Sequence, residues 1–559
     1  MDRFDSSENR PAEEGRAWIP LTSHVPSTLT PSGRRALGSR LAQLPLADPE
    51  ESTRRLLFEL DELTRQPLQP RQRLRMMSLL EVPAGTVVRE QRRRLEQAPQ
   101  PFGRHATESL QQTFTLLHAL AGGFQETVDA FEERHQESTS AATFAMLHTM
   151  RHLGTILELS ALFHLEPPPH LWHRLHQLYQ RARTLPPRRW WQKRHATDEL
   201  LREYGFLLLL HLGDPGSLER AQNRLLADEC RRLAPWLRIE RGDVDPVASH
   251  TAFCPLFLDA GPHLHRVSYP PREQWLQLVL DEVVVALRAS LEEHPGPEGE
   301  RAAAPLRRLR HQLLERWSSS EENRAWPRSS SVGRLELLHG LDAIASLATP
   351  RPADDNAPLD LAPLPGAGML AEGVPTQDPC IERTEPPDLS QLRARHAEAS
   401  VPLQWEILDT GANGYCLRAA PSSRPIQVGQ PVAFRHAGTR DHAWQLGVVR
   451  WLHCLRNGQI RIGVELLCDT LQIWWAAKGS GPQEAVLAIP RCARRSRPTL
   501  AVPTGRFGSR NVLHLWRETT LRRVRLEKCR ESLAGISLFT YRLLPLARRE
   551  EPIAGSGGQ

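Results

Sequence analysis

An alternating pattern near the C-terminal end of this 559-residue chain is the feature that most constrains its fold. Asn457-Gly458 lies between two runs rich in β-branched and aromatic residues, and this dipeptide readily forms a type I′ hairpin turn. After the turn, apolar residues alternate with polar or small ones from Ile460 to Leu466, which is the period of a half-buried strand. A second alternating run extends from Leu403 to Ile407. The stretch therefore predicts a small antiparallel barrel or sandwich.

Two motifs in this stretch resemble those of the PilZ domain, a bacterial β-barrel module known as a receptor for cyclic di-GMP. Asp409-Thr-Gly-Ala-Asn-Gly414 resembles the D/N-x-S-x-x-G motif of that family. Trp444-Gln-Leu-Gly-Val-Val-Arg-Trp451, followed by Ile-Gly-Val-Glu-Leu-Leu at 462–467, is similar to its later strands. The resemblance implies a PilZ-like β-barrel at residues 401–482, with cyclic di-GMP as the candidate ligand and no cofactor.

The resemblance also implies which residues contact the nucleotide. Asp409 and Asn413 would accept and donate hydrogen bonds at a guanine edge, and Gly411 and Gly414 would let the backbone approach closely. Gly411 stands where the family has serine, so one hydroxyl is missing.

The family holds the phosphates with an Arg-x-x-x-Arg pair just upstream, because guanidinium forks match phosphate oxygens. The nearest such pair here is Arg324 and Arg328, and 81 residues separate Arg328 from Asp409. These arginines would clamp phosphates only if the intervening linker folds back. Ligand binding and structural retention of a degenerate ligand site are both consistent with this sequence.

The composition is that of a soluble globular protein with several domains, 40% hydrophobic and 24% charged. The net charge of +6 is mild for this length and does not by itself indicate nucleic acid. The eight cysteines include no C-x-x-C pair, which favours free thiols in a reducing compartment. The N-terminus is unlike a signal peptide and no apolar run could span a bilayer. We therefore predict a cytoplasmic protein with no membrane span.

Shifts in composition predict a helical N-terminal half and a β-rich C-terminal half. Residues 349–400 are rich in proline, alanine, glycine and aspartate, which is typical of a semi-extended linker. Such a linker would leave the two halves separable and free to move. The predicted divisions are a disordered lead at 1–32, helical regions at 33–166 and 167–348, the linker at 349–400, the PilZ-like barrel at 401–482, a basic β-rich extension or second small barrel at 483–547, and a disordered tail at 548–559.

Helix signals are strong in the N-terminal half. Asp48 offers an N-cap, Pro49 the first helical position and Glu51 a capping-box carboxylate. The next helix is expected to start at Pro70 and to stop at Pro83. Further helices are predicted at 107–131, 141–165, 197–212, 217–233, 274–292 and 302–317.

Motifs for catalysis are absent from the sequence. There is no P-loop, no G-x-S-x-G elbow and no H-E-x-x-H. His170, His173 and His176 have a spacing that can ligate zinc, but they lack a Cys or carboxylate partner pattern, so a polar helical stripe is favoured. We predict no enzyme, no catalytic residue and no metal site.

Arginines recur along the C-terminal β-rich segment. A phosphate-rich or acidic partner would use such residues, whereas a solvated charged face needs no partner, and the second interpretation is favoured. The arginines are Arg491, Arg494, Arg495, Arg497, Arg506, Arg510, Arg522, Arg523 and Arg525.

Together these features predict an α+β multidomain protein of bacterial signalling, in which a PilZ-like domain senses cyclic di-GMP and relays it by domain docking or by binding an unknown protein partner. The first alternative is an interaction scaffold whose PilZ-like barrel no longer binds nucleotide. The second is nucleic-acid binding through the basic C-terminal strands, which we regard as the weakest.

Overall fold

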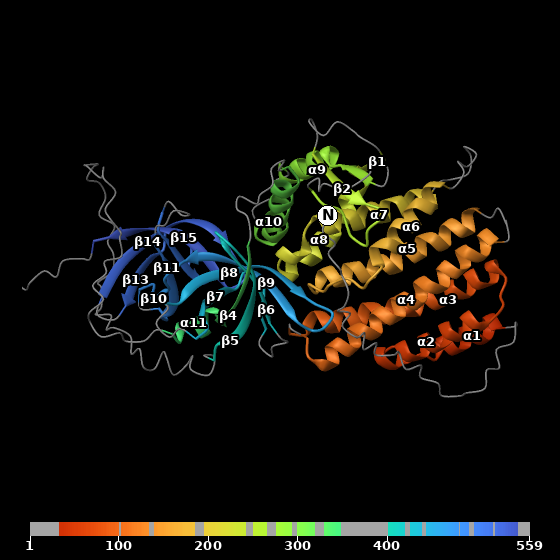
Figure 1. Ribbon diagram of the computed structural model, residues 1–559, viewed down its shortest axis with the longest axis horizontal. Coiled ribbons are helices and arrows are strands. Elements are labelled where there is room, and N and C mark those ends of the chain that lie inside the picture. The colour runs from red at the N-terminus through yellow and green to blue at the C-terminus, as the bar shows by residue number, and fades with distance from the viewer. Residues whose placement is uncertain are drawn as a thin grey trace, which may run out of the picture.

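A helical half and a β half form the two ends of the computed structural model (Figure 1). The description that follows covers residues 33–99, 102–133, 139–184, 195–241, 250–264, 275–292, 299–318, 329–347, 401–419, 425–438, 443–479, 481–490, 497–517 and 520–545. The predicted lead at 1–32, the whole predicted linker at 349–400 and the predicted tail at 548–559 lie outside these residues.

The helices of the N-terminal half begin where the sequence signals place them. The carboxylate of Asp48 accepts hydrogen bonds from the backbone N–H groups of Glu50 and Glu51 at 3.1 Å, and Pro49 is the first helical residue. The helices are α1 (Gly33–Ala42), α2 (Pro49–Arg65), α3 (Pro70–Gln97), α4 (Arg104–Glu133), α5 (Thr139–Leu162), α6 (Leu171–Thr184), α7 (His195–Leu212), the short η1 (Pro215–Ser217), α8 (Arg220–Leu233) and the short η2 (Ala234–Trp236).

The prediction that the helix starting at Pro70 stops at Pro83 is wrong. The helix continues through Pro83 for another four turns. Ala84, Val87 and Leu95 carry its buried stripe onward. Their packing against the neighbouring helices offsets the single backbone hydrogen bond that a proline removes.

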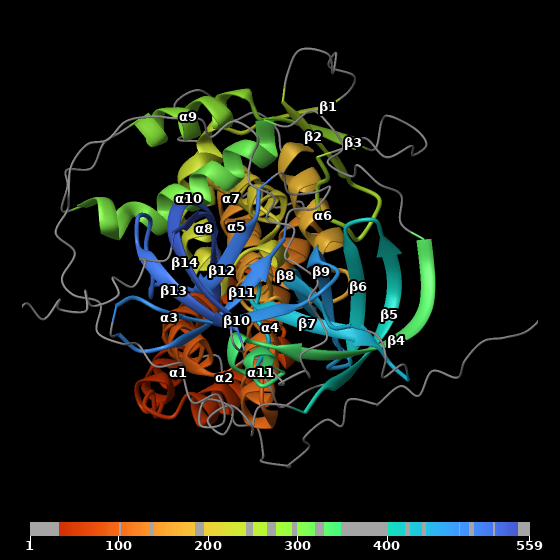
Figure 2. The ribbon, with the colours of Figure 1, turned by 90° about the vertical axis from the view of Figure 1, so that its left-hand side faces the viewer.

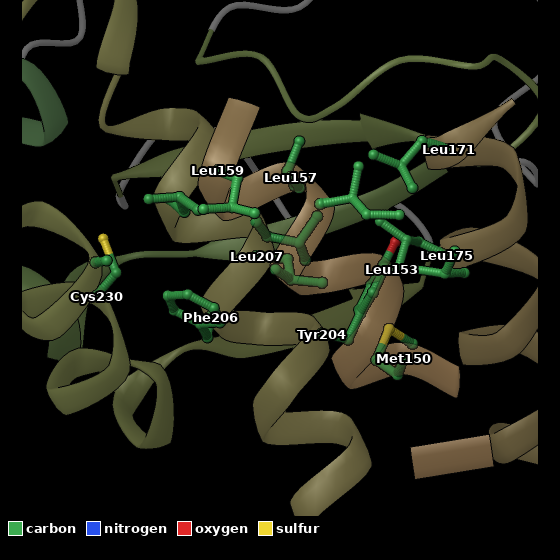
Figure 3. Packing of buried hydrophobic residues seen from close by; sticks show 14 of the residues in the cluster. Met150, Leu153, Leu157, Leu159, Leu171, Leu175, Tyr204, Phe206, Leu207 and Cys230 are labelled. Atoms are coloured by element: carbon green, nitrogen blue, oxygen red, sulfur yellow. The ribbon is translucent and has the colours of Figure 1, made fainter. Parts of the chain in front are cut away.

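One hydrophobic cluster fills the helical half from Leu37 to Trp317. In Figure 3, Met150, Leu153 and Leu157 of α5 pack against Tyr204 and Leu207 of α7. The cluster extends across Pro167, so the two predicted helical regions, 33–166 and 167–348, share a core.

A three-stranded sheet lies within the second of those predicted helical regions, which the sequence analysis did not anticipate. Its antiparallel strands have the order β1 (Arg238–Arg241), β3 (Trp275–Val279), β2 (Thr251–Pro255). The predicted helix at 274–292 is therefore wrong in its first part: β3 precedes α9 (Asp281–Glu292). The five residues of β3 are too few for their alternation to be separated from the helical pattern that follows. Helix α10 (Gly299–Ser318) then leads toward the β half.

The first barrel is closed by six antiparallel strands, and one of them comes from before the predicted linker. The sequence predicts residues 329–339 as part of a helical region, but they form a strand that closes the barrel by pairing with residues 403–410 on one side and 432–436 on the other. The predicted barrel start at residue 401 is corrected accordingly. The strand order is β4 (Ser329–His339), β5 (Leu403–Gly411), β6 (Gly414–Ala419), β9 (Ile460–Cys468), β8 (Gln445–Cys454), β7 (Pro431–His436).

A second closed barrel follows the first, and Figure 2 shows the two side by side. Of the two forms predicted for the C-terminal segment, an extension or a second small barrel, the structure has the barrel. It begins at Gln472 rather than at residue 483. The short helix α11 (Leu341–Ala345) contacts both barrels. The order is β10 (Gln472–Ala477), β11 (Glu484–Ile489), β12 (Thr499–Pro503), β15 (Ile536–Leu544), β14 (Thr520–Ser532), β13 (Val512–Arg517).

The β8–β9 hairpin exists as predicted, but its turn is not type I′. Gly458 has a φ of +80°, whereas Asn457 does not have a positive φ. The N–H of Gly458 donates to Leu455 O at 2.9 Å, and the N–H of Leu455 donates to Gln459 O at 2.8 Å. A three-residue loop with glycine in the left-handed region fits this pattern. The Asn457 side chain instead accepts a hydrogen bond from the Gln459 N–H at 3.0 Å.

Candidate functional site

The Asp409–Gly414 motif forms the tight hairpin that joins β5 to β6. Gly411 and Gly414 face one another across the two strands, leaving Ala412 and Asn413 as the exposed turn. The carbonyl oxygen of Asn413 accepts a hydrogen bond from Leu466 N of β9 at 2.9 Å. A Cβ atom at Gly414 would lie 1.9 Å from the carbonyl oxygen of Val464. The last glycine of the motif is therefore required by the packing of β6 against β9.

A bulge in β5 determines the direction of Asp409. Ile407 pairs with Leu417, and both side chains belong to the barrel core. The next pair is Asp409 with Cys416, so Leu408 is an extra residue in β5. Because residues directly opposite one another share a face, Asp409 lies on the outer face with Cys416. Without this bulge, strand alternation would turn Asp409 into the barrel interior.

Asp409 belongs to a row of residues that crosses the outer face of the sheet. Cys416 pairs with Gly463, and Gly463 pairs with Trp451 of β8. The indole of Trp451 covers Gly463: a Cβ atom there would lie 2.0 Å from the indole nitrogen. At a strand spacing of about 4.8 Å, Gly463 lies about 10 Å from Asp409. The row thus places an aromatic ring and a carboxylate on one surface, within the reach of a dinucleotide.

Strand β4 extends this row on the other side of Asp409. Ser330 pairs with Asp409 and Ser329 with Thr410. The hydroxyl oxygens of Ser329 and Thr410 lie 3.4 Å apart at the exposed edge of the barrel. Consecutive residues of a strand point to opposite faces, so these two hydroxyls lie on the face opposite to Asp409, whereas Ser330 shares the face of Asp409.

The structure places four of the six predicted ligand residues together, namely Asp409, Gly411, Asn413 and Gly414. Arg324 and Arg328 lie outside the described residues. Arg328 nevertheless directly precedes Ser329 in the chain, and Ser329 pairs with Thr410. The separation of 81 residues between Arg328 and Asp409 is therefore a poor guide to their distance, because most of it is an insertion between two paired strands.

The far end of the β8–β9 hairpin is bonded to the helical half. Cys454 N donates to His164 O at 2.7 Å, and Glu166 N donates to Cys454 O at 3.0 Å. Nε of Arg456 donates to Pro167 O at 3.0 Å. The segment after α5 thus forms a short parallel bridge with the end of β8, in which Leu165 pairs with Cys454. The two halves, expected to be freely separable, are joined here by backbone hydrogen bonds.

Histidines line this junction. The ring of His453 lies against Gly216 of η1, where a Cβ atom would be 2.7 Å from the imidazole Cε1. His164 contacts the carbonyl oxygen of Leu218 at 2.8 Å through Nε2. Burial lowers the pKa of His164 and of His211 to about 4, and burial also lowers the pKa of His453. His164 and His211 are therefore neutral at pH 7, and a proton added to either of them would disfavour the docked arrangement.

Sequence reasoning did not find Trp451, Gly463 or His453 as functional candidates. Trp451 ends a run that the sequence predicts as a strand, but its position over Gly463 depends on a strand register that the local pattern does not give. The alternation of Leu335 and Leu337 was the one available signal that residues 329–339 form a strand, and it follows Arg328 directly.

The class of the protein follows from this barrel and from comparisons with known families. The middle PilZ domain of the family described as "Cyclic-di-GMP receptor FimW" matches residues 376–472, and its N-terminal domain matches residues 35–245. This chain is a PilZ-domain protein with a helical N-terminal half. Among curated proteins, it is 27% identical over 567 aligned positions to the cyclic-di-GMP receptor FimW of Pseudomonas aeruginosa, covering 90% of this chain and 89% of that protein.

No solved structure matches the chain. Within the described residues, none of the helices combines the length and the apolar character needed to cross a membrane.

Proposed function

We propose that this chain is a receptor for cyclic di-GMP, with the nucleotide on the outer face of the first barrel. The observation that carries this proposal is the pairing of Ser330 with Asp409. It brings the strand that follows Arg328 to the nucleotide motif, where the family has its arginine pair. The similarity to FimW, named as a cyclic-di-GMP receptor, supports the same ligand.

Each predicted residue then has a chemical role. The Asp409 carboxylate accepts hydrogen bonds from the N–H groups of a guanine edge, and Asn413 at the exposed turn can both donate and accept. The hydroxyl of Ser330, which pairs with Asp409 and shares its face, supplies the polar contact that Gly411 cannot make. Arg324 and Arg328 bind phosphate oxygens as charge-assisted forks.

The Trp451 ring gives the proposed site an aromatic surface. Nucleotide bases stack on aromatic side chains with a gain of about 1–3 kcal/mol per base. Trp451 is half-buried and its ring already covers Gly463, so its orientation is fixed before the ligand arrives. A fixed ring costs little entropy when a base stacks on it.

The proposed relay to the helical half runs along β8. Trp451 and His453 lie on the same outer face with ring centroids 5.5 Å apart. His453 in turn lies against Gly216 of the helical half. A base that stacks on the Trp451 ring therefore lies one side chain away from the contact between the two halves. Binding and docking are coupled only if the ligand has different affinities for the docked and undocked states.

Location and catalytic status are part of the same proposal. Burial raises the pKa of the buried Cys254 thiol to about 12 and that of the partly buried Cys454 thiol to about 11. Such thiols are poor nucleophiles and suit a reducing compartment. We place the protein in the cytoplasm and assign it a binding function rather than an enzymatic one, with an unidentified protein partner.

Calorimetric titration of the full-length chain with cyclic di-GMP tests the proposal. We expect one nucleotide site, weakened about tenfold or more by Arg328→Ala, because a charge-assisted hydrogen bond contributes about 1.5–3 kcal/mol. Arg334→Ala is the matched control, since Arg334 is an exposed arginine of β4, six residues after Arg328 in the sequence, and it should leave the affinity unchanged.

Hydrogen exchange at the amides of Glu166 and Cys454, measured with and without nucleotide, tests the relay separately. Changed protection there supports ligand-dependent docking, whereas binding without any change restricts the function to the barrel. If the wild-type chain does not bind the nucleotide at all, the proposal fails and the interaction scaffold becomes the better account.

A further inference from the structure

Three potential metal ligands meet inside the helical half, far in sequence from the barrel site. Glu81 of α3 and His148 and His152 of α5 each offer one ligand atom, and these atoms all lie within 4.8 Å of one another. The two histidines are four residues apart, so successive helical turns bring both rings to one face of α5. Two helices thus supply one carboxylate and two imidazoles to a single point.

The distances show that all three groups face one another. Nδ1 of His148 lies 2.5 Å from Oε1 of Glu81. Nε2 of His152 lies 3.4 Å from the same oxygen. His148 and His152 are only 7% and 9% exposed, whereas the Glu81 side chain is 26% exposed. The cluster is therefore nearly closed, with an approach from solvent on the Glu81 side.

Aromatic packing fixes the two imidazole rings. Phe124 of α4 stacks on both of them, with ring centroids 5.1 Å from His148 and 5.6 Å from His152. The ring of Phe144 lies 4.1 Å from that of His148. Ligands held in this way lose little rotamer entropy when an ion binds.

The hydrogen bonds within the cluster leave polar atoms without partners. Within the described part of the chain, Nε2 of His152 and Nε2 of His148 are buried and have no hydrogen-bond partner. Buried polar groups are nearly always paired, and an exception calls for an ion or a water. The atom that matters most is Nε2 of His152, since it points toward Glu81 but lacks hydrogen-bond geometry.

We propose that Glu81, His148 and His152 bind one divalent transition-metal ion, with Zn²⁺ as the representative ion. Imidazole nitrogens and a carboxylate oxygen suit Zn²⁺, whereas Ca²⁺ and Mg²⁺ prefer all-oxygen sites. Ligand bonds of about 2.0–2.1 Å in a tetrahedral site place ligand atoms about 3.3 Å apart. The 3.4 Å separation already fits, and the 2.5 Å separation opens by rotation of the partly exposed Glu81 side chain. A water molecule completes the fourth position.

The histidines with zinc-like spacing on α6 provide a contrast within the same protein. His176 uses both ring nitrogens, toward the Tyr204 hydroxyl at 2.8 Å and Ala260 O at 3.0 Å. Nε2 of His173 lies 2.8 Å from the side-chain nitrogen of Gln177. The ring nitrogens of His173 and His176 are thus engaged elsewhere, and spacing along one helix does not identify the Glu81 cluster, which needs two helices to meet.

The test uses the full-length chain, stripped with a chelator and titrated with Zn²⁺ alone. We expect one tight equivalent by calorimetry and by elemental analysis after dialysis, and a higher melting temperature when zinc is present, because an ion that binds the folded state stabilises it. Co²⁺ in place of Zn²⁺ should give the absorption of a tetrahedral site. His152→Ala should lower the affinity at least tenfold and remove the cobalt spectrum.

His173→Ala is the matched control and should retain both the tight equivalent and the cobalt spectrum. Glu81→Gln is the second variant: it keeps the shape of the side chain, removes its charge, and should also weaken zinc at least tenfold. Circular dichroism of the metal-free variants verifies that each is folded. If His152→Ala does not fold, Glu81→Gln decides the outcome. The proposal is overturned if wild-type protein retains no equivalent, or if Glu81→Gln and folded His152→Ala bind zinc as wild type does.

Discussion

The first and second barrels have the same strand order but different chemistry on their connections. With the strands of each barrel numbered from one, both follow the order 1-2-3-6-5-4. In both, the hairpin between the fifth and sixth strands contacts the domain that precedes it. The β8–β9 hairpin bonds to His164 and Glu166 of the helical half, while the β14–β15 hairpin places Ala534 and Gly535 against Gly429 and Pro431 of the first barrel.

The hairpin between the second and third strands is where the barrels differ. In the first barrel it is a two-residue turn that carries Asp409 and the glycines of the motif. In the second, β11 ends at Ile489 and β12 begins at Thr499, and this connection carries arginines in place of a carboxylate. The shared strand order and the docking hairpin thus specify the architecture of each barrel, whereas its ligand chemistry depends on the connection between the second and third strands.

The largest expected effect is on the affinity for cyclic di-GMP, which a substitution in the first barrel should lower and one in the second should not. Asp409→Ala should weaken cyclic di-GMP binding by the full-length chain about 100-fold or more, because two charge-assisted hydrogen bonds to guanine are lost. Arg497→Ala, an exposed change beside the corresponding connection of the second barrel, should change the affinity less than about twofold. Calorimetry measures both, and the opposite ranking would assign the ligand to the second barrel.

Next in size is the effect of adding a methyl group to one glycine in each barrel. Gly414→Ala should destabilise the first barrel by about 3 kcal/mol or more, since the new Cβ atom would lie 1.9 Å from Val464 O. Gly479→Ala, in the β10–β11 connection, meets nothing within 4 Å and costs only the strain of a positive φ, about 1 kcal/mol.

Thermal melting together with hydrogen exchange measures this pair of variants. Faster exchange in β6 and β9 should appear only in Gly414→Ala. Equal shifts in the two variants would mean that the close approach of β6 to β9 is relaxed in solution.

A third prediction concerns the contact between the barrels. Arg450 lies between Glu465 of its own barrel, at 2.5 Å from Nε to Oε2, and Glu531 of the second barrel. Burial opposes the charge of Arg450, but the hydrogen bond to Glu531 and the nearby carboxylates hold its pKa above the ordinary value. Arg450→Met should destabilise the pair of barrels by about 2 kcal/mol, less than a fully buried ion pair, because the side chain is 31% exposed.

Arg418→Met is the matched control, since Arg418 pairs with Glu406 inside the first barrel and both side chains are well exposed. It should cost about 0.5 kcal/mol or less. Urea unfolding measured with a probe in each barrel distinguishes the two variants. A loss of stability confined to one barrel in Arg450→Met would show that this arginine does not hold the barrels together.

Local sequence signals predicted much of this fold. The cap at Asp48, the apolar helical stripes and the alternating strands after Leu403 each depend on neighbours within a few residues, and the structure confirms them. Strand β4 was missed because its partners lie beyond a long insertion, and periodicity does not identify a distant partner. The continuation of α3 through Pro83 was missed because tertiary packing overrides the local cost of proline.

The candidate site was predictable in its residues but not in its geometry. The motif Asp409–Gly414 is legible in the sequence, whereas the bulge at Leu408 that turns Asp409 outward is not. The same holds for the ring of Trp451 over Gly463, which follows from register. Long-range pairing, rather than residue type, decides which side chains share a surface.

The smallest expected effect distinguishes a docking hairpin from a free loop. Gly458 and Gly505 both have a φ of +80°, so an alanine at either position should cost about 1 kcal/mol through backbone strain. Gly458 lies at the tip of the hairpin whose Arg456 and Cys454 bond to the helical half, while Gly505 meets nothing within 4 Å. The two variants should therefore melt alike, yet only Gly458→Ala should speed hydrogen exchange at the amides of Cys454 and Glu166, which donate the hydrogen bonds of the bridge. Unchanged exchange at these amides would mean that the bridge between the halves does not depend on the shape of the turn. The hairpin would then be held against the helical half by the ends of its strands alone.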